Sequence, residues 1–210
     1  MQARAESAQA TRDRIVGAMV ELLLEHWYDE VTLRDLAKAA GVALQTIVNH
    51  FSTKEGVLAA TLEDPRLAAA FGGERNEVPA GDSRHAVAML VDSYEHAGDA
   101  TIRLLALESR LPALASLLAF GRDGHREWVQ NTFPAALEGL TGAEQERRIV
   151  LLICATDVYT WKLLRRDQGL TREQTGAAIL ELVEALYTDD VRRGRRGRSS
   201  AGRTAPKGSL

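Results

Sequence analysis

Short hydrogen-bonding side chains gather in the stretch LQTIVNHF, residues 44–51, and they suggest the first chemistry to consider. Gln45, Thr46, Asn49 and His50 carry amide, hydroxyl and imidazole groups, rather than the Glu and Lys mixture of an ordinary solvated helix face. Groups of this kind bind base edges and phosphates in the major groove of DNA. The alternative is the polar surface of an ordinary helical hairpin, and the elements around the stretch decide between the two.

The surrounding sequence, TLRDLAKAAGVALQTIVNHF (residues 32–51), has the pattern of two short helices joined by a sharp turn. Ala37 is small enough for a close crossing of the helices, and Gly41 can adopt a left-handed backbone without steric cost. Ile47 and Phe51 would form the apolar underside of the second helix. This spacing predicts a DNA-binding helix-turn-helix with the polar face of its second helix left exposed.

Elsewhere apolar residues recur at helical spacing, and we therefore predict an all-α fold. Ser or Thr followed three residues later by an acid or amide marks several helix starts, as at Thr32–Asp35, Ser52–Glu55 and Thr171–Gln174. The expected helices cover about residues 8–27, 33–40, 44–51, 53–63, 83–97, 99–109, 112–137, 142–167 and 172–188.

From about Arg12 to Leu58 the chain resembles the N-terminal DNA-binding domain of the TetR family of bacterial transcriptional regulators. The resemblance covers about a quarter of the chain and rests on Thr32, LAKAAGV, TIVNHF and STKEGVL, whose order and gaps all agree. It implies contacts with bases or nearby backbone from Arg34, Leu44, Gln45, Val48 and Asn49. It implies phosphate contacts from Thr46, His50 and Lys54, while Thr32 would cap its helix and could also contact phosphate.

Two positions depart from the family pattern. Ala43 stands where the family usually has a serine, so the second helix should lose an N-cap that typically stabilises it by about 1 kcal/mol. Val48 stands where a tyrosine often contacts phosphate, which leaves either lower affinity or apolar contact of Leu44 and Val48 with thymine methyl groups. We favour the second, because Gln45 and Asn49 offer adenine contacts beside them. The hypothesis is a half-site that contains A·T pairs.

The predicted organisation is an N-terminal three-helix helix-turn-helix DNA-binding domain at residues 8–64 and a larger C-terminal helical ligand-binding and dimerisation domain at residues 65–190. The boundary lies in a stretch rich in Pro and Gly, residues 63–82, and Pro65 should interrupt the connecting helix there. Residues 191–210 contain seven Arg and Lys and no acid, so we predict a basic disordered tail. The tail is either simply solvated or adds attraction to phosphates.

The C-terminal domain contains a segment, residues 144–164, that is apolar on more than one face. Together with TGAAILELVEAL (residues 175–186) it predicts a four-helix interface, and thus a homodimer through the last two helices. The alternative is a wholly internal core. Aromatic and polar residues in this domain also suggest a pocket for a small-molecule effector, although plain core packing is the better explanation of any single ring. The candidate ligand-binding residues are Tyr94, Glu108, His125, Trp128, Asp157 and Trp161.

Composition excludes several other classes of protein. The net charge of −3 over 210 residues gives no bulk attraction to nucleic acid, so DNA binding must be local. The single cysteine, Cys154, is expected in the core, and no spacing of residues indicates a metal or cofactor. Ser109, His125 and Asp157 could form a triad on paper, but no catalytic motif accompanies them, which indicates a protein that is not an enzyme. Without a signal peptide or spanning segment, we expect a cytoplasmic protein with no membrane partner.

The sequence therefore predicts a ligand-responsive transcriptional regulator that binds a double-stranded DNA operator. By the same resemblance it is a repressor, released from its operator by a small-molecule effector. The alternative is a helical small-molecule binding protein whose DNA-binding head has decayed, with Ala43 and Val48 as the signs of that decay.

Overall fold

The computed structural model describes residues 2–70 and 80–200 of the chain. Within these residues every regular element is helical, which confirms the all-α prediction. The elements are α1 (Gln2–Glu25), α2 (Leu33–Ala40), α3 (Leu44–Phe51), α4 (Lys54–Leu62), α5 (Pro65–Ala70), α6 (Ser83–Leu105), α7 (Pro112–Thr132), η2 (Pro134–Ala136), α8 (Gly142–Thr156), α9 (Val158–Lys162), η3 (Leu163–Asp167) and α10 (Arg172–Ser200).

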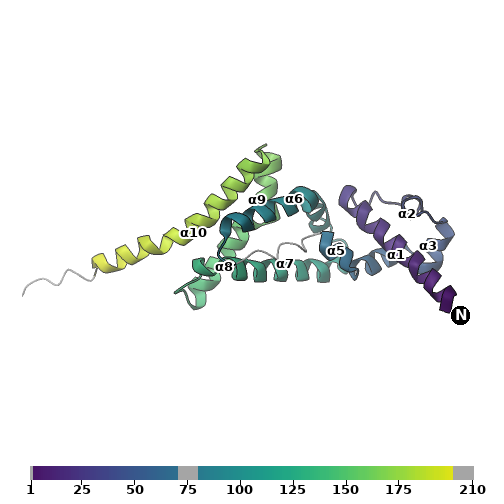
Figure 1. The fold of residues 1–210 in the computed structure, drawn as a ribbon, viewed down its shortest axis with the longest axis horizontal. Helices are drawn as coiled ribbons and strands as arrows, with labels where there is room; N and C mark the ends of the chain where they lie inside the picture. The colour runs from purple at the N-terminus through teal and green to yellow at the C-terminus, as the bar shows by residue number, and fades with distance from the viewer. Residues whose placement is uncertain (1, 71–79, 201–210) are drawn as a thin grey trace, which may run out of the picture.

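Helices α1 to α4 form a head at one end of the molecule, and helices α6 to α10 form an elongated body (Figure 1). Helices α6 and α7 run along the middle, and their joined ends reach the head. Helix α10 leaves the body toward the end remote from the head. The predicted helices at 33–40 and 44–51 are confirmed residue for residue.

The head has a core that the body completes. Its buried residues come from α1 to α4, but also from the turn between α6 and α7, where Leu104, Leu107, Leu114 and Leu118 are buried. Burial of apolar surface is the main favourable contribution to the free energy of such packing. The head and the body are therefore joined by one packed junction. This core draws on both sides of the predicted division at residues 64 and 65, and residues 71–79 of that linker lie outside the described residues.

Polar contacts also stabilise the junction between the head and the body. Arg103 of α6 donates to the backbone oxygen of Leu24 at the end of α1, and Arg110 forms an ion pair with Asp29. The break predicted at Pro65 is present, because α4 ends at Leu62 and α5 begins at Pro65. A single direct helix therefore does not link the head to the body, and the α6–α7 turn provides the packed connection.

Helix α6 is one continuous helix, whereas the sequence predicted two, at 83–97 and 99–109. Gly98 is the residue between these two predicted helices. In the structure a Cβ atom at Gly98 would lie 2.5 Å from Cζ3 of Trp161, a fully buried side chain. Glycine at this position therefore allows Trp161 to pack against the helix, and it does not end the helix.

The helix predicted at 142–167 is divided at Asp157, whose ψ of 151° is extended. The Asp157 carboxylate accepts a hydrogen bond from the Tyr159 amide at 2.8 Å and so caps α9. The break frees backbone oxygens of α8, and two hydroxyl groups donate to them: Tyr94 to Thr156 at 3.0 Å and Thr160 to Cys154 at 2.5 Å. Side chains thus satisfy the acceptors that the division of the helix exposes.

Other helix ends differ from the prediction for local reasons. Helix α7 stops at Thr132, before residue 137, because Pro134 disfavours a helical backbone at Phe133 and then begins the short η2 turn. Helix α1 starts at Gln2, before residue 8. Helix α10 continues to Ser200, into the segment predicted to be a disordered tail from residue 191, and arginine is a good helix former. Residues 201–210 lie outside the described residues.

Apolar residues remain exposed on the outer faces of α8 and α10. Val150 is 45% exposed and Leu182 is 46% exposed. Cys154, one turn after Val150, is exposed as well, so its predicted place in the core is wrong: α8 turns this face away from the body. In the described part of the chain no helix combines the length and apolar character that crossing a membrane requires.

Candidate nucleic-acid interface

Two helix caps hold α2 in place before the recognition helix. The Thr32 hydroxyl accepts a hydrogen bond from the Asp35 amide at 3.2 Å, and the Asp35 carboxylate accepts one from the Thr32 amide at 3.0 Å. The Thr32 hydroxyl also donates to the Asp35 carboxylate at 2.5 Å, and this bond first, with the bond from the Thr32 amide, lowers the pKa of Asp35. At the other end Gly41 has a φ of 63°, the left-handed conformation that the sequence predicted. Both ends of α2 are therefore fixed by local sequence.

Helix α3 has a buried side and an exposed side. Ile47 and Phe51 are buried in the core of the head, as predicted. On the other side Gln45 and Asn49 are exposed, next to Leu44 at 39% and Val48 at 37% exposure. Thr46 and His50 are half-buried, while Thr32 and Arg34 of the preceding segment are exposed. We call Leu44, Gln45, Val48 and Asn49 the reading face.

The two amides of the reading face are joined to each other. Nε2 of Gln45 donates to Oδ1 of Asn49 at 2.9 Å, a contact between residues one helical turn apart. The bond leaves the Gln45 carbonyl oxygen as an acceptor and the Asn49 amide nitrogen as a donor. Adenine presents the complementary pair, an acceptor at N7 and a donor at N6, in the major groove. The pair is thus fixed in a form suited to an adenine edge.

The N-terminus of α3 lacks a side-chain cap. Ala43 occupies the cap position with an extended backbone, and no side chain bonds the amides of the first turn there. The Thr46 amide is bonded to the Ala43 backbone oxygen at 2.9 Å. Amides at a helix start attract phosphate oxygens when no side chain engages them.

Lys54, which the resemblance assigned to phosphate, is engaged within the head. Its Nζ donates to the backbone oxygens of Tyr28 at 2.9 Å and Val31 at 3.0 Å. It also lies over the Tyr28 ring, 4.1 Å from the ring centre. Lys54 therefore ties the start of α4 to the loop between α1 and α2, and its phosphate contact stays a prediction. The local sequence gave no sign of these long-range acceptors.

The turn between α3 and α4 is unusually tight. Ser52 has a φ of 63°, and the Thr53 amide bonds back to the Phe51 oxygen at 2.7 Å. Thr53 then caps α4 by accepting from the Gly56 amide at 3.1 Å, so the predicted cap at Ser52 is wrong by one residue. A Cβ atom at Gly56 would lie 2.2 Å from the Phe51 backbone oxygen. Only glycine fits this position without moving α3 relative to α4.

We expect Gly56→Ala to lower stability by about 1–3 kcal/mol, because overpacking against backbone cannot be relieved by a rotamer change. Chemical denaturation measures the effect. The matched control is Gly121→Ala, in α7, where a new Cβ would meet nothing within 4 Å. That control should be neutral or stabilising, since alanine is the better helix former. Equal stability of the two variants would contradict this view of the turn.

The candidate ligand-binding residues divide into a cluster and one outlier. Tyr94, His125, Trp128, Asp157 and Trp161 all belong to the region where α8 is divided. Burial raises the pKa of the Asp157 carboxyl, partly offset by its bond from the Tyr159 amide. Glu108 is not part of the cluster, because it forms an ion pair with Arg122, with an oxygen–nitrogen distance of 2.6 Å.

Polar groups of the cluster bond to protein atoms. Nε2 of His125 lies 3.0 Å from the hydroxyl of Thr156, and the His125 ring stacks on Trp128. The Trp161 indole donates to Glu95 at 3.1 Å. Sequence reasoning missed both Thr156 and Glu95, although a threonine at the end of an otherwise apolar run was an available signal. A ligand role for the cluster stays a prediction.

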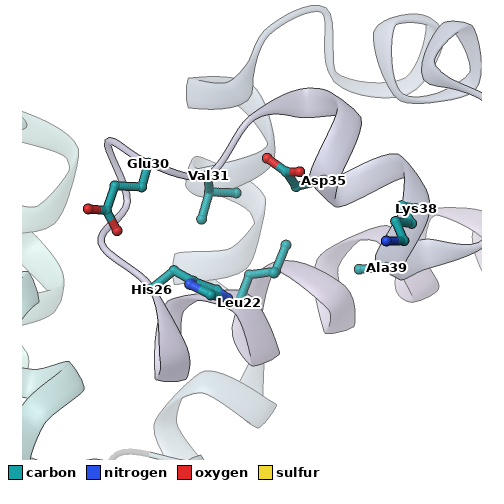
Figure 2. Close-up of a pocket in the computed structure, with 7 residues that line it drawn as sticks. All are labelled: Leu22, His26, Glu30, Val31, Asp35, Lys38 and Ala39. Atoms are coloured by element: carbon teal, nitrogen blue, oxygen red, sulfur yellow. The ribbon is translucent and has the colours of Figure 1, made fainter.

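An open groove of about 530 Å³ lies elsewhere, on the head between α1, α2 and the loop that joins them (Figure 2). Sequence reasoning did not point to it. The groove is lined by Leu22, His26, Glu30, Val31, Asp35, Lys38 and Ala39. Asp35, one of its two acidic residues, already caps α2, and the groove does not adjoin the aromatic cluster of the body. It therefore gives no support to the predicted effector site.

Comparison with known proteins agrees with the geometry of the head. Residues 15–61 match the model of a family described as bacterial regulatory proteins, tetR family. The HTH-type transcriptional regulator AlkX of Mycobacterium tuberculosis (strain ATCC 25618 / H37Rv) is 43% identical over 54 residues. These residues are 25% of this chain and 26% of AlkX, so the chain matches about a quarter of that relative's length.

Solved structures extend the likeness to the body. A protein of Mesorhizobium loti MAFF303099, described as a TetR-family transcriptional regulator, superimposes with a TM-score of 0.61 at 15% identity, over 85% of this chain and 96% of that one. A transcriptional regulator of Rhodococcus sp. Rha1 gives 0.60 at 21% identity, over 83% and 95%. At such identities the likeness concerns the fold.

The fold and the reading face define the class: an all-helical protein with an N-terminal helix-turn-helix and a larger helical body. Within that class, residues 15–61 of the head resemble the tetR family of bacterial regulatory proteins.

Proposed function

We propose that this protein is a DNA-binding transcriptional regulator that acts on a double-stranded operator in the cytoplasm and has no enzymatic activity. The reading face of α3 carries the proposal: Gln45 and Asn49 are exposed, bonded to each other, and held outward by buried Ile47 and Phe51. An ordinary solvated hairpin has no need of such an amide pair. AlkX, which matches in the head, is named a transcriptional regulator.

The proposed active form is a homodimer, because two half-sites give the affinity that one weakly basic head cannot. The exposed apolar faces of α8 and α10, with Val150, Cys154 and Leu182, support an interface between these helices. An isologous interface buries each such residue twice about a two-fold axis. Because the predicted 142–167 helix is divided, its second part, α9, packs on α6, whereas α8 packs on α10. The proposed interface therefore uses α8 and α10.

We further propose that a small molecule bound in the body releases the protein from its operator, as a repressor. Support comes from the cluster of Tyr94, His125, Trp128 and Trp161 where α8 is divided. Helix α6 contributes Tyr94 to this cluster and Leu104 to the head core, so one rigid element joins the two regions. A ligand acts only to the extent that it binds the two states differently.

Leu44 and Val48 lead to a prediction about the operator. Replacing the contacted thymines by deoxyuridine removes one methyl group each and should weaken binding by about 0.8 kcal/mol per buried methyl. The measurement is a competition titration of substituted duplexes. With Leu44→Ala/Val48→Ala the same replacement should have no effect, since the apolar partner is gone. A protein that loses no affinity at any thymine would rule out these contacts.

The proposed function is tested by a gel shift with the DNA upstream of the protein's own gene. A complex that resists excess unrelated duplex is the expected result. If the protein binds no specific duplex there or in a random pool, but takes up a small molecule tightly, the decayed-head alternative is correct. Mass spectrometry of the purified protein under native conditions would identify a ligand that stays bound.

A further inference from the structure

Helix α1 reaches beyond the core of the head toward the end of α3. Its first buried residue is Ile15, and residues 5–10 are exposed. Figure 1 shows this N-terminal end of α1 at the same end of the molecule as α3. Arg12 lies on the same side of α1 as the buried residues Ile15, Val16 and Met19, about one turn before them.

The guanidinium of Arg12 lies over the ring of Phe51, with its carbon 4.5 Å from the ring centre. Phe51 is the last residue of α3, so a cation from another helix covers the C-terminal end of the recognition helix. Arg12 itself is half-buried, and one side of its planar group rests on the ring. Stacking of this kind fixes the position of a guanidinium without using its hydrogen-bond donors.

The position of Phe51 on α3 tells which edge of the reading face Arg12 borders. At about 100° per residue, Phe51 lies about 20° from Leu44 and about 60° from Val48 around the helix. Thr46 and His50 lie beyond Asn49, on the other edge. A helix in the major groove runs between two phosphate backbones, one along each edge. Thr46 and His50 therefore face one backbone, and Arg12 faces the other.

The cation expected from family resemblance near this helix is otherwise engaged. Lys54 donates to the backbone oxygens of Tyr28 and Val31 and rests on the Tyr28 ring. Val48 in turn has no hydroxyl to offer to phosphate. Arg12 therefore places positive charge at the edge of α3 next to Leu44 and Val48.

We propose that Arg12 binds a phosphate of the DNA backbone along the Leu44–Val48 edge of α3, while Lys54 serves to hold the head together. The inference rests on the proposed function and assigns a phosphate contact within it. Arg12 neutralises one phosphate in each subunit and fixes the depth of α3 in the groove. A contact of this type adds affinity for all sequences and little discrimination.

Salt dependence of binding measures the contact directly. The slope of log Kd against log salt concentration should fall by about 0.9 for each lost phosphate contact, and by about twice that for a dimer. We expect this for Arg12→Met, whose side chain can still cover Phe51. Arg12→Lys should keep most of the slope, because the charge remains. The control is Arg84→Met, an exposed arginine at the start of α6 in the body, which should keep the wild-type slope.

A second measurement locates the contact on the DNA with the wild-type protein and Arg12→Met. Neutral methylphosphonate is placed at single positions along the operator backbone, and the affinity of each duplex is measured. One position in each half-site should weaken wild-type binding and have no further effect on Arg12→Met. An unchanged salt slope for Arg12→Met would overturn the inference, and so would the absence of any methylphosphonate position with this effect. In either case a specific complex of the wild-type protein with its operator would leave the proposed function standing. If the wild-type protein formed no specific complex with DNA, both the Arg12 inference and the proposed function would be contradicted.

Discussion

The Gln45→Ala/Asn49→Ala variant should lose specific operator binding while remaining folded. One good bidentate base contact provides about 1–3 kcal/mol of discrimination, and a dimer makes it in two half-sites. The expected loss is therefore roughly 2–6 kcal/mol, or from about 30-fold to more than 10,000-fold in Kd. Residual binding should discriminate between sequences only weakly, through Leu44 and Val48, because most of the remaining affinity comes from the retained phosphate contacts. Fluorescence anisotropy with operator and scrambled duplexes measures both the specific and the residual affinity.

Stability should change little in this variant, which makes the result interpretable. Both side chains are exposed and bond each other, so removing the pair leaves no buried group without a partner. Alanine is also the better helix former. The matched control, Gln130→Ala/Asn131→Ala, removes the same two residue types from an exposed position in α7. If the two double variants bound the operator equally well, the reading face would be assigned to the wrong residues.

The second large effect concerns the dimer. Leu182→Asp places a carboxylate on the exposed apolar face of α10, where the proposed interface would bury it. An uncompensated buried charge costs about 3–5 kcal/mol, and the two-fold axis places two of them in each dimer. We expect a folded monomer in analytical ultracentrifugation. Specific operator binding should be lost with the dimer, since a single head engages one half-site.

The single cysteine provides an independent measure of the same interface. Cys154 is exposed in the isolated protomer and lies one turn from Val150 on α8. Its reaction with maleimide should be slow in the wild-type dimer and fast in Leu182→Asp. The control is Phe120→Asp, which changes a side chain of α7 that is 71% exposed. This variant should leave the sedimenting mass and the rate of Cys154 labelling unchanged. Rapid labelling of a wild-type protein that sediments as a dimer would place the interface elsewhere.

The helix-turn-helix could be predicted residue by residue because local rules determine it. A capping box at Thr32 and Asp35, a left-handed turn at Gly41 and the apolar spacing of Ile47 and Phe51 all act within a few residues. The exposed amides followed from the same spacing. The dimer and the effector pocket were expected from the apolar and aromatic residues of the body, and family resemblance agreed with both expectations.

Contacts between distant segments decided what the sequence could not predict. Gly98 lies between two predicted helices, but the helix continues through it, and the glycine leaves room for the ring of Trp161 from α9. The local sequence did not indicate that Lys54 also holds the head together, because its acceptors are two backbone oxygens that the loop before α2 brings to its side chain. The division of α8 at Asp157 depends on Tyr94, a residue of α6. In each case a partner far along the chain overrode the local pattern.

The junction between head and body has a similar origin. Pro65 predicted correctly that no single helix would join the two parts. The leucines at the α6–α7 turn that complete the head core, such as Leu104 and Leu114, had no distinguishing local signal. Arg103 and Arg110 add contacts to α1 and its following loop. A ligand in the body could therefore move the head through packed side chains rather than through a connecting helix.

Selection of bound sequences from a random duplex pool tests the central claim most directly. The account predicts enrichment of a palindrome whose half-sites lie about one helical turn apart or somewhat more, with A·T pairs within each half-site. The Gln45→Ala/Asn49→Ala variant should enrich this palindrome far less from the same pool. If the wild-type protein enriched no sequence over the input, the reading of α3 as a recognition helix would be contradicted.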